Sequence, residues 1–301
     1  MSKLTSANSY VFIKDKLTLQ EDEIHIWVTK PELLLGGCLD NLSLLKQYSN
    51  LLTEEETIKQ QRYKFDKDKH DALITRAFIR DLLSYYADVE PQAWRFVKGE
   101  KDKPEIINPP LPLRFNISHT KGLIICAVTL TNDIGCDVEN TSRSNDVLAI
   151  AERYFSAQES KELFSLTIEQ QRDRFFDYWT LKESYIKAWG LGLAIPLTDF
   201  TFTIDDKIND KMTSKANSEV NGEESTMAST LKFSIKDNIK LNFASHRIDE
   251  PNIWRSWLVY PTDDQKHRIA LSLRSHKNIQ KTNFSLRFFN TLPLRGYHEI
   301  I

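Results

Sequence analysis

The sequence predicts an α+β fold made of two similar halves. Short alternating or continuous apolar stretches predict strands, and longer segments with apolar residues at helical spacing predict helices. These elements are interspersed without the strand–helix–strand repeat of a parallel sheet. Each half contains one long helix that carries Lys or Arg and is bracketed by strands. We therefore expect two α+β subdomains, residues 1–130 and 131–274, followed by a C-terminal tail at residues 275–301.

In the first half, residues 24–28 alternate in polarity and predict a strand. Thr53-Glu-Glu-Glu56 is a capping-box pattern that starts a helix. A densely basic stretch at residues 59–69 follows and runs into a long helix through about Ala87. Further strands are predicted at 94–97, 115–119 and 123–131. Asn132-Asp133 turns the chain into residues 134–139, so the strands on either side of this turn are expected to pair as a hairpin.

In the second half, residues 149–154 look helical, and Ser156-Ala-Gln-Glu159 is another capping box. An aromatic-rich helix follows from Phe175 to the glycine at 190, which is a typical helix terminator. Strands are predicted at 199–204, 231–235, 241–248, 252–260 and 267–273. Residues 205–229 are polar without apolar periodicity, and we expect them to be a disordered surface insertion.

The length, charge and composition of the chain exclude several classes of protein. A chain of 301 residues can bury one large core or two modest ones. Its formal charge of −2 argues against a dedicated nucleic-acid-binding protein. No apolar run is long enough to span a bilayer, and residues 1–8 do not resemble a signal peptide. The three cysteines show no metal-ligand spacing and predict reduced, buried thiols. We expect a cytoplasmic protein that binds neither membranes nor nucleic acid.

The aromatic helix carries charges beside a large apolar surface. Its pattern is Trp179-x-x-Lys182-Glu183-x-x-x-Lys187. Side chains three or four residues apart lie next to each other on a helix, so Glu183 and Lys187 can meet. An ordinary surface ion pair is the commoner fate of that spacing. The alternative is that these charges are neutralised by a metal ion or a phosphate.

A second acidic motif helps to decide between a surface ion pair and a metal or phosphate site. In Asp137-Val-Glu139 the two carboxylates lie at i and i+2 on a strand and project from one face. Taken alone, this is more often a solvated strand end. Joined by Glu183, the pair becomes a candidate three-carboxylate site for Mg²⁺, with Mn²⁺ possible, because hard oxygen ligands suit these ions. Ser118-His119 after a strand is a candidate phosphate-binding pair, although His119 by itself is more often structural.

Metal-binding carboxylates, lysines and phosphate-binding candidates together indicate phosphoryl chemistry. At this point the chain resembles the surfactin-type (Sfp-type) 4′-phosphopantetheinyl transferases. The motifs that carry the resemblance are Gly135-Cys-Asp-Val-Glu139, Trp179-Thr-Leu-Lys-Glu-Ser-Tyr-Ile-Lys187, Phe115-Asn-Ile-Ser-His119 and Lys103-Pro104.

The resemblance implies a pseudo-twofold monomer of two α+β halves with the site between them. It implies that coenzyme A and Mg²⁺ bind there, and that a serine of an apo acyl or peptidyl carrier protein attacks the β-phosphorus and releases adenosine 3′,5′-bisphosphate. It also implies residue roles. Asp137, Glu139 and Glu183 hold the metal, Glu183 deprotonates the serine, Lys187 binds the diphosphate with help from Lys182, Ser118 and His119 hold coenzyme A phosphate, and Lys103 and Lys59 hold its 3′-phosphate end.

Two other functions stay open from the residues alone. Strand carboxylates beside a lysine also occur in metal-dependent phosphodiesterases and nucleases, although the chain lacks a contiguous basic stretch. The second alternative is a homologue that binds carrier proteins but does not catalyse the transfer. For the transferase, we expect the carrier to dock near Leu148, Ile150 and Arg153.

Overall fold

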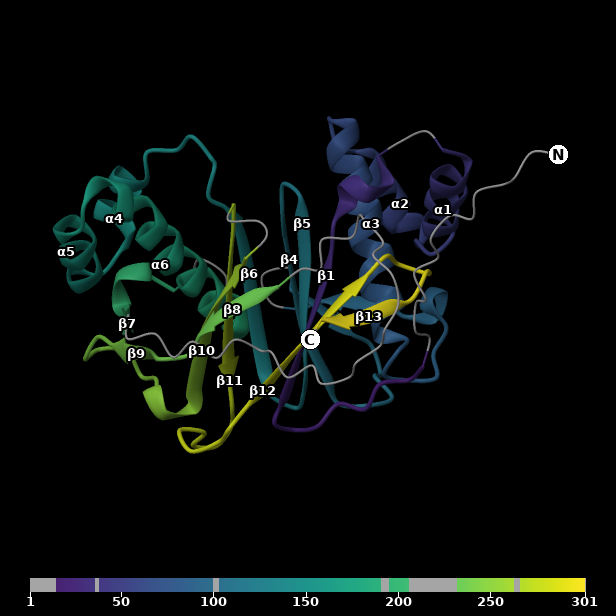
Figure 1. The fold of residues 1–301 in the computed structure, drawn as a ribbon. Helices are drawn as coiled ribbons and strands as arrows, with labels where there is room; N and C mark the ends of the chain where they lie inside the picture. The colour runs from purple at the N-terminus through teal and green to yellow at the C-terminus, as the bar shows by residue number, and fades with distance from the viewer. Residues whose placement is uncertain are drawn as a thin grey trace, which may run out of the picture.

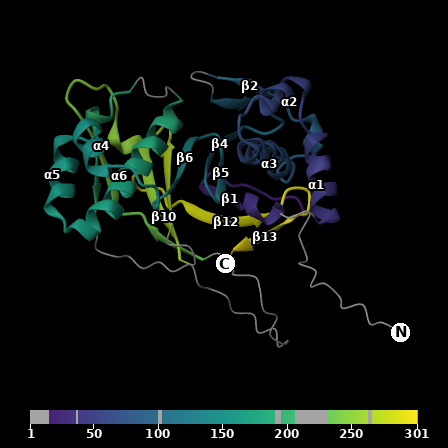
Figure 2. The same ribbon diagram turned by 90° about the horizontal axis from the view of Figure 1, so that it is seen from above.

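Two β-sheets stand side by side between two long helices (Figures 1 and 2). The computed structural model describes residues 15–35, 38–99, 103–190, 195–205, 232–262 and 266–300. The first sheet has the strand order β13-β12-β1-β5-β4, and the second has the order β6-β11-β10-β8. The predicted α+β class is confirmed.

The strands of the first sheet are β1 (Glu23–Thr29), β4 (Leu113–Thr120), β5 (Leu123–Leu130), β12 (Ser285–Thr291) and β13 (Tyr297–Ile300). Those of the second are β6 (Asp133–Asn140), β8 (Phe233–Lys236), β10 (Trp254–Pro261) and β11 (His267–Arg274). Two small ribbons are β2 (Phe96–Lys98) with β3 (Pro104–Ile106), and β7 (Phe200–Ile204) with β9 (Ile239–Phe243). The helices are α1 (Leu39–Ser49), α2 (Glu54–Gln61), α3 (Asp66–Leu83), α4 (Val147–Tyr154), α5 (Ala157–Ser165) and α6 (Ile168–Trp189).

The two halves repeat one topology. In the first, a strand, a long helix and a pair of strands follow each other as β1, α3, β4 and β5, with β5 lying between β1 and β4. In the second, β6, α6, β10 and β11 follow in the same order, with β11 between β6 and β10. This repeat confirms the expected pseudo-twofold arrangement of the fold.

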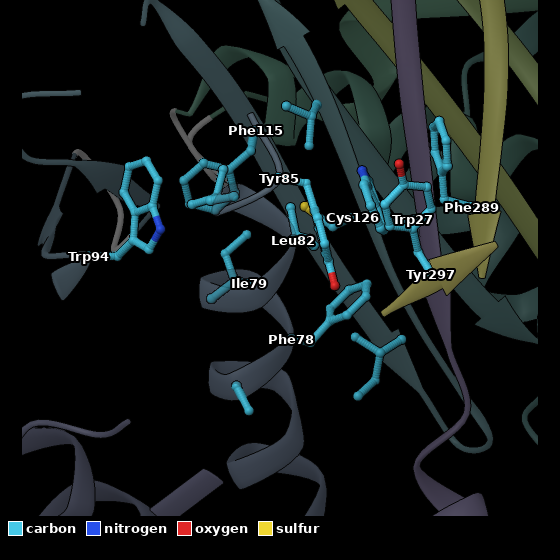
Figure 3. Packing of buried hydrophobic residues seen from close by; sticks show 14 of the residues in the cluster. Trp27, Phe78, Ile79, Leu82, Tyr85, Trp94, Phe115, Cys126, Phe289 and Tyr297 are labelled. Carbon is cyan, nitrogen blue, oxygen red and sulfur yellow. The ribbon is translucent and has the colours of Figure 1, made fainter. Parts of the chain in front are cut away.

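Three apolar clusters hold these layers together. Figure 3 shows the first, in which Phe78 and Leu82 of α3 pack toward Trp27 of β1. The Trp27 ring stacks on Phe289 of β12 with their centroids 4.8 Å apart. A second cluster lies between the two sheets, and a third joins α6 to the second sheet. Both faces of β1 are therefore buried, which explains why six of its seven residues are buried.

The expected hairpin across residues 132–133 is wrong. β5 pairs with β1 on one edge and with β4 on the other, while β6 pairs with β11. A strand has only two hydrogen-bonding edges, so β5 has none left for β6. The chain instead passes from one sheet to the other between Leu130 and Asp133.

The helix that begins at the capping box and the long helix of the first half form as α2 and α3, with a break between them. Phe65 has an extended backbone, with φ −104° and ψ 139°, and Asp66 and Asp68 lie in the first turn of α3. Acidic residues favour a helix N-terminus through the helix dipole. The capping boxes at Thr53 and Ser156 form as predicted.

The segment set apart as a tail contributes to the first sheet. β12 pairs in parallel with β1, and β13 pairs with β12. Phe289 and Tyr297 of these strands belong to the first core cluster. Of the expected insertion at 205–229, all but Asp205 lies outside the described residues. Of the thiols, Cys126 and Cys136 are buried as expected, whereas Cys38 is exposed.

Buried polar groups occur in the first core as well. The His25 side chain is fully buried, and its Nδ1 lies 2.9 Å from the hydroxyl of Tyr86. That hydroxyl accepts a hydrogen bond from Trp27 Nε1 at 2.7 Å, which leaves its own proton for His25 Nδ1. Burial lowers the pKa of His25 to about 3, and the charge of Arg287 adds to this effect. The folded protein therefore holds this imidazole neutral.

The buried imidazole predicts a loss of stability in acid. The unfolded chain protonates His25 below a pKa of about 6.5, whereas the folded state resists protonation until about 3. The free energy of unfolding should therefore fall as pH drops. His25→Gln is the comparison, because glutamine keeps a hydrogen-bond acceptor for Tyr86. Between pH 7 and 5, the free energy of unfolding measured in urea should fall by about 2 kcal/mol more in the wild type than in His25→Gln. Equal losses in both proteins would contradict this assignment.

Candidate active site

The candidate site lies where β4, β6 and α6 meet. Asp137 of β6 is buried, and its Oδ1 lies 2.6 Å from Lys187 Nζ of α6. Ser118 of β4 donates a hydrogen bond to the same Oδ1 at 3.1 Å and accepts one from Lys187 Nζ at 2.9 Å. These three side chains thus join the two halves of the fold through one carboxylate.

The ion pair that forms is different from the one expected within the helix. Lys187 pairs with Asp137 on β6, whereas helical spacing alone suggested Glu183 as its partner. Burial disfavours the charge of Lys187, but Asp137, together with Cys136 and Glu183, outweighs this effect and raises the pKa of the lysine. The ammonium is therefore charged at neutral pH.

Glu139 follows Asp137 on β6 by two residues and lies toward α6. Its Oε1 accepts a hydrogen bond from Trp179 Nε1 at 3.2 Å, and its Oε2 lies 2.8 Å from Arg143 Nη1. Burial and the neighbouring charge of Asp137 raise the pKa of Glu139, against the opposing effect of Arg143. The two carboxylates thus share one environment, as their spacing predicted.

Glu183 lies one helical turn before Lys187 on α6. Burial, followed by the charges of Asp137 and Glu139, raises the pKa of Glu183 to about 7. The Asp137 carboxylate thus disfavours the ionised forms of both Glu139 and Glu183, and Glu139 adds to the effect on Glu183. A carboxyl group with a pKa near 7 can act as a general base at neutral pH.

The three acidic residues fit a hard divalent cation. The second oxygen of Asp137, Oδ2, is buried and has no hydrogen-bond partner within the described chain. A buried carboxylate oxygen without a partner is costly, and a cation removes that cost. All the donors are oxygen atoms, the ligands that Mg²⁺ and Mn²⁺ prefer. In the arrangement of the described residues, however, no three His, Cys, Asp or Glu side chains lie so that together they could hold a metal ion.

Lys182 does not reach this cluster. Its side chain is fully buried, and its Nζ lies 2.8 Å from Glu159 Oε2 of α5. The ammonium also donates to the carbonyls of Leu197 and Phe200, each at 2.8 Å. All three of its donors are therefore used in holding α6 to α5 and β7. A role for Lys182 in binding coenzyme A does not fit this position, which the helical pattern alone could not reveal.

Lys103 lies at one end of a cavity of about 740 Å³ between the halves. Its Nζ lies 3.4 Å from the carbonyl oxygen of Ile134 and 3.3 Å from that of Ala188, near the end of α6. Burial lowers the pKa of Lys103, opposed by the charges of Asp133 and Glu105. Trp189 also lines the cavity.

The two remaining predicted site residues are more exposed. His119 is exposed near the end of β4. Its partial desolvation and the positive charge of Lys187 lower the pKa of His119. The imidazole can thus remain neutral near pH 7. Lys59 is exposed on α2, which packs against α3 in the first half.

Two residues that shape the site were not predicted from the sequence. Arg143 follows β6 and pairs with Glu139. Asn116 precedes Ser118 by two residues on β4, and its Oδ1 accepts a hydrogen bond from the Cys136 backbone N–H of β6 at 2.8 Å. Asn116 belongs to the motif Phe115-Asn-Ile-Ser-His119. Because residues two apart on a strand project from the same face, the position of Asn116 relative to Ser118 could have indicated its role. Nothing in the local pattern around Arg143 indicated its partner.

Comparison with known proteins places this geometry in a family. The model of the 4′-phosphopantetheinyl transferase superfamily matches residues 133–272, and that of the 4′-phosphopantetheinyl transferase N-terminal region matches residues 42–131. The 4′-phosphopantetheinyl transferase HetI of Nostoc sp. is 34% identical over 183 residues, which cover 59% of this chain and 73% of HetI. This chain belongs to the 4′-phosphopantetheinyl transferase superfamily.

Another member of the superfamily is similar to a comparable extent. The 4′-phosphopantetheinyl transferase Sfp of Bacillus subtilis is 34% identical over 157 residues, which cover 52% of this chain and 68% of Sfp. The solved structure of Thermotoga maritima holo-[acyl-carrier-protein] synthase is a distant match, with 16% identity and a TM-score of 0.30 over 56% of this chain and 82% of that chain. Among the described residues, no helix is both long and apolar enough to cross a membrane.

The buried pair of Lys182 and Glu159 predicts a large effect on stability. Lys182→Met removes the cation and leaves the Glu159 carboxylate buried without it, which should cost about 3–5 kcal/mol of unfolding free energy. Adding Glu159→Gln should recover part of that loss because no buried charge then remains. Denaturant unfolding measures both values. Lys161→Met, at an exposed position on α5, is the control and should change stability by less than about 0.5 kcal/mol.

Proposed function

We propose that this protein transfers the 4′-phosphopantetheine group of coenzyme A to a serine of an apo acyl or peptidyl carrier protein. The observation that carries the proposal is the ion pair of Lys187 with Asp137 at the junction of the two halves, in a chain of this superfamily. Burial and the charge of Asp137 also raise the pKa values of Glu139 and Glu183, which supports one shared site. The serine oxygen forms a bond to the β-phosphorus of coenzyme A. The bond from that phosphorus to the bridging oxygen breaks, and adenosine 3′,5′-bisphosphate leaves with the electron pair.

Glu183 is the proposed general base. The serine hydroxyl must lose its proton as it attacks, and a carboxylate with a pKa of about 7 accepts that proton efficiently at neutral pH. The shifted pKa has a physical cause in burial and in the two carboxylates nearby. The same side chain lies one turn from Lys187, so base and cation act from one helix.

Lys187 and the Ser118 hydroxyl are proposed to bind the diphosphate. The ammonium keeps its proton because Asp137 stabilises it, so it can donate to phosphoryl oxygens. Asp137, Glu139 and Glu183 would hold Mg²⁺, and Mn²⁺ is possible. A bound divalent cation supplies neutralisation of diphosphate charge in such transfers.

The cavity beside Lys103 is the proposed binding region for coenzyme A. It opens between β4, β6 and the end of α6, which also carry Ser118, Asp137 and Lys187. Lys103, His119 and Lys59 stay proposed contacts for the phosphates of coenzyme A. Because Lys103 already contacts two carbonyl oxygens, binding a phosphate requires its ammonium to exchange partners.

The carrier protein is proposed to dock on α4. Leu148 and Ile150 are half-buried on this helix, and Arg153 is exposed. The next residue, Tyr154, packs edge-on against Trp179, whose indole N–H contacts Glu139. A carrier on α4 would therefore lie beside the carboxylates. We expect the enzyme to act as a monomer.

Glu183→Gln tests the catalytic assignment. It removes the base but keeps the size of the side chain, so transfer should fall by a factor of about 10²–10⁴ while the fold persists. Mass spectrometry of an apo carrier incubated with coenzyme A and Mg²⁺ measures the added phosphopantetheine. Glu169→Gln, an exposed glutamate at the start of the same helix, is the matched control and should transfer normally. Normal turnover by Glu183→Gln would exclude it as the base.

Arg153→Glu tests the docking surface. Charge reversal at an exposed position of α4 should repel an acidic carrier, raising its KM about tenfold while the KM for coenzyme A stays the same. Lys46→Glu, an exposed reversal on α1 of the other half, is the control for net charge. Similar changes in both variants would show that docking does not depend on α4.

A further inference from the structure

β4 and β6 are edge strands of different sheets, and they lie against each other where the two halves meet. They do not form a strand ladder with each other, because β4 pairs with β5 and β6 pairs with β11. A buried edge without a partner leaves backbone N–H groups unsatisfied, which costs free energy. Some other group must therefore satisfy the edge of β6 that faces β4.

Side chains of β4 perform this task. Asn116 Oδ1 accepts the backbone N–H of Cys136 at 2.8 Å, and Ser118 Oγ accepts that of Val138 at 3.3 Å. Cys136 Sγ donates in return to the carbonyl oxygen of Asn116 at 3.0 Å. Asn116 and Ser118, two residues apart on β4, thus contact Cys136 and Val138, two residues apart on β6. The residue between the two anchored amides is Asp137.

The other side of β6 is equally constrained. A Cβ atom at Gly135 would overlap the backbone carbonyl of Ser184 and the backbone amide of Ala188, so α6 lies directly on the strand there. β6 is therefore held between the backbone of α6 and the side chains of β4. The contact with β4 is therefore one of the constraints on where Asp137 lies relative to α6.

We propose that Asn116 is a positioning residue for the acidic site. It anchors β6 one residue before Asp137 and thereby sets the distance between that carboxylate and the charged groups of α6. Unlike Ser118, it does not hydrogen-bond the side chain of Asp137 or Lys187. The inference rests on the proposed function, because it assumes that these carboxylates hold a divalent cation.

Mn²⁺ binding tests this role without measuring turnover. Binding is followed by electron paramagnetic resonance on the full-length protein with coenzyme A present. Asn116→Ala removes the acceptor, and the protein should bind Mn²⁺ about tenfold more weakly than the wild type. Asn116→Asp keeps an oxygen acceptor at that position and should bind Mn²⁺ at least as tightly as the wild type. Asn116→Ser, with a shorter polar side chain, takes the place of the alanine variant if that variant fails to fold.

Val128→Ala separates positioning from general loss of stability. Val128 is buried in the first sheet on β5, in the cluster beneath α3, and belongs to no contact between β4 and β6. This variant should be less stable but should bind Mn²⁺ like the wild type. Equal weakening in Val128→Ala and Asn116→Ala would overturn the proposal, as would wild-type affinity in Asn116→Ala or its serine substitute. Loss of affinity in Asn116→Asp would also overturn it.

The result for the wild type distinguishes this inference from the proposed function. If the wild type neither binds Mn²⁺ nor modifies a carrier, the proposed function fails, and the assumption behind the role of Asn116 fails with it. If the wild type does both and the Asn116 variants match it, the function stands and the positioning role is refuted.

Discussion

The site depends on how Asp137 is held. Its carboxylate lies at the point where β4, β6 and α6 meet, and it receives a cation from α6 and a hydroxyl from β4. Burial and the charge of Asp137 raise the pKa of two further carboxylates, Glu139 and Glu183. Such crowding is unfavourable in the folded chain by itself, because like charges repel in a partly desolvated site. A divalent cation would relieve that repulsion, so a feature that costs stability becomes one that favours cation binding.

The rest of the fold fixes the two surfaces that bring these charges together. α6 is anchored on its far side by the buried pair of Lys182 and Glu159, and it lies against β6 closely enough to require glycine at position 135. β6 is fixed on one edge by β11 and on the other by the side chains of β4. Consecutive residues of one motif thus have opposite roles. Lys182 supports the helix from within the core, whereas burial and the charges of Asp137 and Glu139 act on Glu183 and raise its pKa.

Patterns confined to one element were predicted well from the sequence. The capping boxes, the aromatic helix, the shared face of Asp137 and Glu139, and the family resemblance depend on spacing within about ten residues. Features that depend on tertiary partners were not predicted. β5 could not form the expected hairpin because β1 occupies its other edge, and β12 and β13 join the first sheet through pairing with β1 across the whole chain. The partners of Lys182, Arg143 and Asn116 were hidden for the same reason.

The central claim is that Asp137, Glu139 and Glu183 converge on one divalent cation between the halves. Anomalous diffraction from crystals grown with coenzyme A and Mn²⁺ tests it most directly, because the anomalous signal locates manganese independently of the refined protein atoms. We expect one peak in contact with carboxylate oxygens of Asp137 and Glu183, beside the diphosphate of coenzyme A. A bound coenzyme A whose manganese lies away from these residues would refute the proposed cation site.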